Sequence, residues 1–279
     1  MTPSAPPLTQ PLLELLEHEL LASKGFVAIH AAEALIEHGF DFKVSARFQA
    51  DADSTVPGYR IGVWRVLARI AKDRNERQRF VGRIRRVMLD PAAPDRLGAA
   101  ESLAKLNLAS RWERPALEKW LQAADDASAV FPLWLLVLSG GAAERAGHEA
   151  RLVRLLESND PLARLRASFA LGRFEMASAE SIEKLMQRAR VEAADSPARV
   201  YLLGAALLHA PRGSAAAAAF KEQLLGVFGR GQANEQFEAA TVIGLRGSPE
   251  DLPALLGLLK SKEADARVGA AGAALRLVR

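Results

Sequence analysis

Three polar side chains near the N-terminus have a spacing that could support chemistry. His30, Glu33 and Glu37 stand at i, i+3 and i+7, so a helix would place all three on one face. An imidazole beside carboxylates can bind a metal or move a proton. The His-Glu-x-x-His order of a zinc protease helix is missing, and a histidine on a polar surface is the simpler interpretation. His30 and Glu33, with Glu101 further along the chain, are therefore weak catalytic candidates, and we expect neither a metal nor a cofactor.

These residues belong to a segment that recurs along the chain. The nine-residue frame V-A-I-H-A-A-E-A-L covers 27–35, with small residues at its fifth, sixth and eighth places and leucine at its ninth. It fits again with its last leucine at positions 67, 103, 138, 171, 207, 245 and 275. The mean spacing of about 34 residues is typical of solenoids built from helix pairs. We expect the frames to form the second helix of each pair.

Composition favours helices and excludes several kinds of site. The chain has 279 residues, is 49% hydrophobic and only 6% aromatic, and contains no cysteine. Disulfides, thiolate metal sites and a cysteine nucleophile are therefore excluded. The longest apolar run, at 130–138, is interrupted by Pro132 and is far shorter than the roughly 20 residues that cross a bilayer. With no secretory signal pattern at the start, these features predict a cytoplasmic all-α protein without a membrane contact.

Amphipathic segments between the frames predict the first helices of the pairs. Leu13, Leu16 and Leu20 follow the helical period in the first of them. The segments expected to be helical are 11–22, 75–89, 111–124, 143–157, 178–193, 214–228 and 249–260. We expect one continuous domain over 1–279, with a flexible arm at 1–10 and an atypical, loop-rich segment at 40–58. In that segment Asp51 and Asp53 indicate a turn, because the other ligands of a calcium loop are missing.

The last frame, at 267–275, is almost entirely alanine and glycine, and no polar capping helix follows it. The end faces of a solenoid need to be covered. We therefore expect this helix to present its small residues to a partner, to a second copy of the chain or to solvent.

Several frames resemble bacterial HEAT-like repeats of the phycobilin-lyase type. The resemblance is carried by V-x-x-x-A-A-x-A-L at 27–35, A-A-E-S-L at 99–103 and A-R-L-R-A-S-F-A-L-G at 163–172, and it covers most of the chain. It implies a right-handed, armadillo-like α-solenoid (superhelix) of about eight helix-pair repeats. The family includes scaffolds, phycobilin lyase subunits and base-excision glycosylases, so the resemblance indicates architecture more than activity. Trp64 departs from the family pattern, in which alanine is usual at that place.

The fourth, seventh and eleventh places of the frame share a helix face that would line the concave side of such a solenoid. In the apolar fourth and sixth frames this face would show Leu133, Leu136, Leu202 and His209. Elsewhere it predicts a partner-binding surface of Arg65, Arg69, Glu101, Lys105, Arg166 and Phe169. An alternative is that Glu33, Arg65 and Glu101 pair in a ladder between neighbouring helices.

The region 60–86 concentrates positive charge. It holds ten Lys or Arg residues against Asp73 and Glu76, whereas the whole chain has a net charge of +4. Such a concentration could attract nucleic acid, although an ordinary solvated helix face has the same appearance. The nucleic-acid candidates are Arg74, Arg77, Arg83, Arg85 and Arg86.

Three functions follow as hypotheses. The first is a non-enzymatic scaffold or adaptor that binds a protein or peptide on its concave face. The second is a lyase-type or small-ligand enzyme subunit that uses His30 and Glu33. The third is a glycosylase-like nucleic-acid-binding protein that uses the basic region. The sequence leaves the oligomeric state open.

Overall fold

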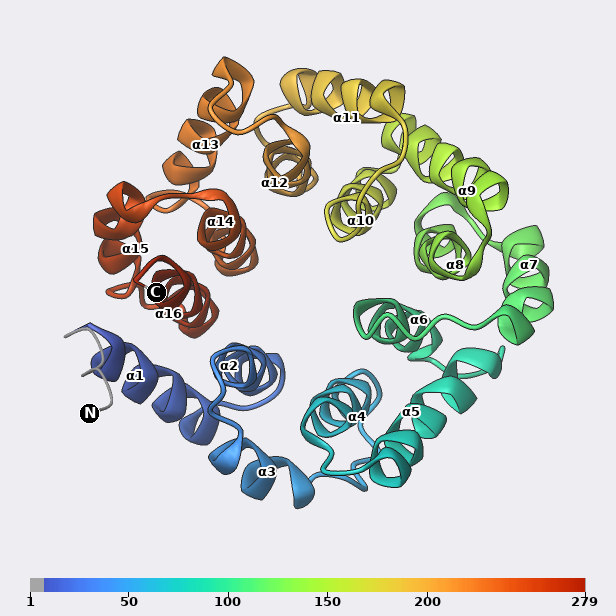
Figure 1. The fold of residues 1–279 in the computed structure, drawn as a ribbon, viewed down its shortest axis with the longest axis horizontal. Helices are drawn as coiled ribbons and strands as arrows, with labels where there is room; N and C mark the ends of the chain where they lie inside the picture. Colours follow the sequence, from blue (N-terminus) through green and yellow to red (C-terminus); the bar gives the residue numbers. More distant parts are fainter. Residues whose placement is uncertain (1–7, 279) are drawn as a thin grey trace. The chain divides into compact units, whose positions relative to one another are not determined.

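The computed structural model describes residues 8–278, and the only regular secondary structure in this part of the chain is helical (Figure 1). It contains sixteen α-helices and three short 3-10 helices, with no β-strand among the described residues. The all-α class is therefore confirmed. Residues 1–7, which make up most of the arm predicted to be flexible, lie outside the described residues, and α1 already begins at Thr9.

The helices form two compact units. The first unit combines both ends of the chain, up to Arg74 and from Lys221 onward, and the second comprises Asn75–Phe220. The first contains α1 (Thr9–Ala22), α2 (Phe26–Glu37), α3 (Phe42–Gln49), α4 (Tyr59–Ile70), α14 (Ala233–Arg246), η3 (Pro249–Asp251), α15 (Leu252–Leu258) and α16 (Ala264–Leu277). The second contains α5 (Arg74–Leu89) from its second residue, α6 (Arg96–Lys105), η1 (Arg111–Glu113), α7 (Arg114–Ala123), α8 (Asp126–Ser139), α9 (Ala142–Arg154), η2 (Leu155–Glu157), α10 (Pro161–Leu171), α11 (Ala179–Val191) and α12 (Arg199–His209), while α13 (Ala215–Val227) belongs partly to each.

Odd- and even-numbered helices of the second unit are buried differently. The buried residues of α11 are Ser181, Leu185 and Ala189, a single stripe at i, i+4 and i+8. In contrast, α12 buries Val200 and every residue from 202 to 207. Within this unit, α6, α8, α10 and α12 form an inner row and α7, α9 and α11 an outer row (Figure 1). Of the inner helices, α8 and α12 are buried around most of their circumference, whereas α6 and α10 also carry charged side chains.

The leucines that close the recurring frame all lie on even-numbered helices. Those at 35, 67, 103, 171, 207 and 275 are at most 2% exposed. The assignment of Leu245 is wrong, because its side chain is 48% exposed while Ile243, two residues earlier, is fully buried. The frame fits α14 as A-A-T-V-I over 239–243, since isoleucine fills the same space in the core as leucine.

The apolar run at 130–138 lies within α8, which continues through Pro132. Its residues from 130 to 137 are buried. In the described part of the chain, no helix combines the length and the apolar character that a membrane span requires.

The segment 40–58 contains one short helix, α3, which buries Val44 and Phe48. Asp51 lies in the turn that follows and accepts hydrogen bonds from the Tyr59 hydroxyl and the Arg47 guanidinium. Burial raises the pKa of Asp51, but these two hydrogen bonds outweigh it and hold the pKa below its usual value. The Asp51 carboxylate is thus engaged in holding the turn.

Arginines near the start of several even-numbered helices anchor the chain that precedes each helix. A guanidinium N–H satisfies a carbonyl that the end of a helix or a turn leaves unpaired. The bonds are Arg96 Nε to Met88 O at 2.9 Å, Arg164 Nη1 to Ser158 O at 2.7 Å, Arg199 Nη1 to Ala189 O at 3.2 Å and Arg267 Nη1 to Ser261 O at 2.9 Å. These bonds tie the start of each helix to the segment that precedes it.

Helix α16 is covered by α1, α2 and α14 of the same unit (Figure 1). Nearly all of its residues from Ala266 to Leu275 are buried. A Cβ added at Gly272 would lie 3.3 Å from the Ala34 side chain, and one added at Gly269 would lie 3.0 Å from Phe237. The expectation that its small residues face a partner, a second copy or solvent is therefore wrong. They allow the last helix to pack closely against the first ones, a contact between distant positions that no local pattern reveals.

Two ion pairs and one hydrogen bond between a histidine and a carboxylate cross this terminal interface, by which we mean the contact of α16 with α1 and α2. Arg267 Nε lies 2.9 Å from the Glu19 carboxylate, Arg276 Nε lies 2.7 Å from Glu37, and His30 Nδ1 lies 2.9 Å from Asp265. The Glu19 side chain is only 4% exposed, so its charge depends on Arg267 for compensation.

Replacing Arg267 with alanine is expected to lower the free energy of unfolding by about 2 kcal/mol, because a buried carboxylate loses its partner while the guanidinium itself is partly solvated. A double-mutant cycle with Glu19→Ala, measured by urea unfolding, should give a coupling energy of about 1 kcal/mol or more. The exposed Lys24 serves as control, and Lys24→Ala should not couple to Arg267→Ala. Additive effects of the Glu19 and Arg267 variants would contradict the terminal interface.

Candidate functional site

The three polar residues of α2 are each bound by a different neighbour. His30 stacks on Phe237 with ring centroids 4.3 Å apart, and its Nδ1 is bonded to Asp265. Glu33 accepts a hydrogen bond from Arg65 Nε at 2.8 Å and lies 3.7 Å from Arg69. Glu37 is paired with Arg276. The side chains therefore hold helices together, and in the part of the chain that the structure describes no group of three or more His, Asp or Glu residues could hold a metal ion.

Arg65 and Arg69 differ in their surroundings although both approach Glu33. Arg65 is 5% exposed and belongs to the core of the first unit, whereas the Arg69 side chain is 35% exposed. The Glu33–Arg65 pair matches the first step of the proposed charge ladder. Glu101 belongs to the second unit, where it accepts a hydrogen bond from Lys105 at 2.6 Å.

The inner row of the second unit brings together cations and aromatic rings from α6, α8, α10 and α12. Phe169 lies at the centre: the Arg173 guanidinium is 3.8 Å from its ring centroid and the Lys105 ammonium is 5.0 Å away. Trp134 and Tyr201 meet the same ring edge-on, each at 6.3 Å. We call Lys105, Trp134, Phe169, Arg173 and Tyr201 the inner-face cluster. It contains two residues of the predicted partner-binding surface, Lys105 and Phe169.

Arg166 lies one helical turn before Phe169 on α10, and its Nη1 donates to the Ala127 carbonyl at 3.1 Å. Its guanidinium thus connects α10 to the start of α8. Four of the six predicted partner-binding residues therefore lie on two helices of the inner row. Glu101 and Lys105 are on α6, and Arg166 and Phe169 are on α10.

Sequence reasoning missed Trp134 and Tyr201 as members of this cluster. Instead it assigned Leu133, Leu136 and Leu202 to the concave face, but each of these is at most 2% exposed. That assignment is wrong, because α8 and α12 are apolar all round and give no period from which to choose a face. The one feature of the sequence that could have indicated Tyr201 is the rarity of tyrosine, since the chain has only two. His209, also assigned to this face, is half-buried, and its Nε2 lies 2.8 Å from the Leu171 carbonyl.

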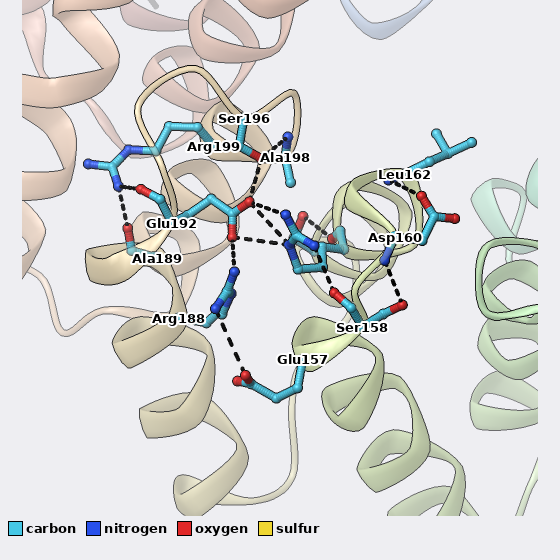
Figure 2. A network of polar contacts seen from close by, with 12 residues as sticks. Glu157, Ser158, Asp160, Leu162, Arg188, Ala189, Glu192, Ser196, Ala198 and Arg199 are labelled. Carbon is cyan, nitrogen blue, oxygen red and sulfur yellow. Dashed lines mark hydrogen bonds and ion pairs between the residues drawn. The ribbon is translucent and has the colours of Figure 1, made fainter.

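A buried carboxylate, Glu192, fixes the helices that bear the cluster (Figure 2). Its side chain is fully buried, and its Oε1 accepts a hydrogen bond from Nη2 of Arg164 on α10 at 2.7 Å. Arg188 and the Ser196 hydroxyl also donate to it, from α11 and from the loop before α12. Since Phe169 lies on α10 and Tyr201 on α12, the network around Glu192 determines how the two rings meet.

Two buried carboxylates of the second unit respond differently to burial. Burial raises the pKa of Glu192, but hydrogen bonds from Arg164, Ser196 and Arg188 outweigh it and leave the pKa below its usual value. At Glu113 burial again raises the pKa, and here Arg85 and the Ser110 backbone N–H do not compensate, so the pKa stays above its usual value. Glu113 is more deeply buried and has fewer donors than Glu192, and both differences act in the direction of its higher pKa.

The predicted nucleic-acid residues lie on α5, which packs through Phe80, Val81, Ile84 and Met88. Arg74, Arg77 and Arg86 are exposed, and Arg83 and Arg85 are partly buried. Arg85 is committed to structure, because its Nε donates to Glu113 at 2.9 Å and its Nη2 to the Leu108 carbonyl at 3.1 Å. The helix thus combines one structural arginine with several solvated ones.

Two pockets of about 570 and 530 Å³ lie among α7 to α11 in the second unit. Neither is lined by His30, Glu33 or Glu101. Glu149, at the larger pocket, is almost fully buried and accepts the backbone N–H groups of Ala177 and Ser178. Its carboxylate therefore stabilises the start of α11.

In comparisons with known proteins, no family model matches this chain, and no curated protein sequence matches it significantly.

Proposed function

We propose that the protein is a non-enzymatic scaffold or adaptor that binds a protein or peptide along the inner row of its second unit. The architecture we propose is a right-handed α-solenoid of about eight HEAT-like helix-pair repeats. The even-numbered helices carrying the frame, and their burial on several sides, support this architecture. The titratable residues of α2 are engaged in ion pairs and a hydrogen bond between helices, which favours the scaffold over the enzyme hypothesis.

The observation that carries the proposal is the inner-face cluster. Phe169 and Tyr201 remain partly exposed, and the cations of Arg173 and Lys105 lie against the Phe169 ring. Aromatic residues and arginine dominate binding energy at protein interfaces because they bury large areas and form directed polar contacts. A helix-borne aromatic ring flanked by cations suits a peptide segment in which an apolar side chain stands next to a carboxylate.

The geometry of the cluster is preorganised for binding. The Glu192 network fixes α10 against α11, and Arg166 fixes α10 against α8, so the rings need not reorder when a partner arrives. Preorganisation lowers the entropic cost of association. The same rigidity argues against an induced catalytic pocket in this unit.

Substitution of Phe169 by alanine is expected to weaken partner binding at least tenfold, because truncating an aromatic anchor typically costs more than about 1.4 kcal/mol. A displayed library of random peptides, selected against the wild-type protein, would supply ligands, and fluorescence anisotropy would measure their Kd. The selected peptides should share an acidic residue next to an apolar one.

Phe42→Ala is the matched control, because Phe42 is a phenylalanine of the first unit with 84% exposure. It should leave every Kd unchanged. If the selected peptides bind the Phe169→Ala protein as tightly as the wild type, the inner-face cluster is not the binding surface.

A further inference from the structure

Helix α5 has a solvent face made of arginines. Arg79, Arg83 and Arg86 follow one another at i, i+4 and i+7, and they lie away from the stripe of Phe80, Ile84 and Met88 that packs into the second unit. All six basic residues of α5 are arginine, and none is lysine. Arginine presents a planar fork of donors that matches the oxygens of a phosphate group, whereas lysine offers a single point charge.

Some arginines of the second unit that pack between helices have carboxylate partners, as Arg85 has in Glu113 and Arg164 has in Glu192. Among the described residues, none forms an ion pair with Arg77, Arg79 or Arg86. The acids nearest in sequence are Glu76 on the same helix and Asp90 at its end. Like charges at helical spacing repel one another, so an anion bound beside Arg79 and Arg86 would relieve that repulsion.

Gly82 lies in the middle of this row, between Arg79 and Arg86. A Cβ built at Gly82 would meet no atom within 4 Å, so packing does not require glycine there. Glycine in a helix interior costs about 1 kcal/mol relative to alanine. Because Gly82 has no side chain, the helix backbone between the guanidinium groups is accessible to a ligand.

An exposed tryptophan flanks the same helix. Trp112, on η1, is 60% exposed, and the Arg85 guanidinium lies 5.9 Å from its ring centroid. An exposed indole is a surface on which an unpaired base can stack, and such stacking contributes about 1–3 kcal/mol per base. An acidic protein segment would use the arginines but would have no comparable use for the ring.

We propose that the outer surface of α5, together with Trp112, binds single-stranded nucleic acid. The phosphates are bound by Arg79, Arg83 and Arg86, and one base stacks on Trp112. This surface belongs to the outer side of the second unit, so it is separate from the inner-face cluster, and the two proposals stand or fall independently.

The test is fluorescence anisotropy of a fluorescein-labelled oligothymidine of about 20 nucleotides, long enough to cover one site, titrated with the full-length protein at several salt concentrations. Three phosphate contacts on a single strand predict a slope of log K against log salt of about −2. The triple variant Arg79→Gln, Arg83→Gln, Arg86→Gln should bind at least tenfold more weakly, with a slope close to zero. Trp112→Ala should weaken binding several-fold and leave the slope unchanged.

A variant with Lys184→Gln and Arg190→Gln on α11 controls for the loss of exposed positive charge, and it should bind like the wild type. Circular dichroism of each variant establishes that it is folded. The proposal is overturned by absence of binding at low salt, or by unchanged affinity of the triple variant. It is also overturned if Trp112→Ala has no effect and a polyglutamate peptide competes as well as the oligonucleotide, which would assign the surface to an acidic protein.

Discussion

Replacing Glu192 with alanine is expected to lower the free energy of unfolding by about 3–5 kcal/mol, because it leaves buried guanidinium groups without their carboxylate. Arg164 and Arg188 both donate to Glu192, whose side chain is fully buried between α10 and α11. Urea unfolding followed by circular dichroism measures the change. Glu180→Ala, at the start of α11, is the control, since Glu180 is exposed and its loss should change stability by less than about 0.5 kcal/mol.

The pH dependence of this stabilisation has a definite sign. The pKa of Glu192 is lowered in the folded protein, so the contribution is fully present above the pKa of the unfolded chain. It is lost as the pH falls through the lower, folded-state pKa. The wild type should therefore lose stability on acidification more steeply than Glu192→Gln, and parallel pH profiles of the two proteins would contradict the ionised network.

Substitution of Gly244 by alanine is the second change with a large expected effect. A Cβ at this position would lie 2.7 Å from the Ala273 Cα and 2.8 Å from its Cβ, so α14 and α16 would have to move apart. We expect a loss of about 3 kcal/mol in the free energy of unfolding, the upper end for overpacking, because the obstacle is backbone. The higher helix propensity of alanine recovers only part of this loss.

Gly147→Ala provides the matched comparison for Gly244. Gly147 lies in the interior of α9, where a Cβ would meet nothing within 4 Å. The same substitution should there raise stability by about 0.5–1 kcal/mol. Thermal unfolding of both variants separates packing from propensity, and equal shifts of Tm would rule out close contact between α14 and α16.

Local periodicity made most helices predictable from the sequence. The amphipathic segment expected at 178–193 corresponds to α11, and the one at 75–89 to α5, because each needs one apolar stripe and a solvated face. The frame gave a wrong assignment at α14, because it required leucine at its ninth place instead of any side chain of similar size and shape. Ile243 fills the core there, and Leu245 does not.

The candidate site was less accessible to sequence reasoning. Phe169 and Lys105 were found because frame position alone selects the face of α6 and α10. Trp134 and Tyr201 lie on helices that are apolar throughout, so the pattern there could not distinguish faces. The partner of Glu19 was beyond any local rule, because Arg267 stands 248 positions away along the chain.

The terminal interface also determines the order in which the protein can mature on the ribosome. Helix α1 is synthesised before α16, yet the surface the two helices share has no counterpart until α16 has emerged. At a synthesis rate of about 5–20 residues per second, the apolar side chains that α1 and α2 later bury against α16 stay uncovered for on the order of 10–50 s. The second unit, whose helices contact near neighbours, can form during that interval. Nascent chains should therefore depend on chaperones mainly through their N-terminal helices.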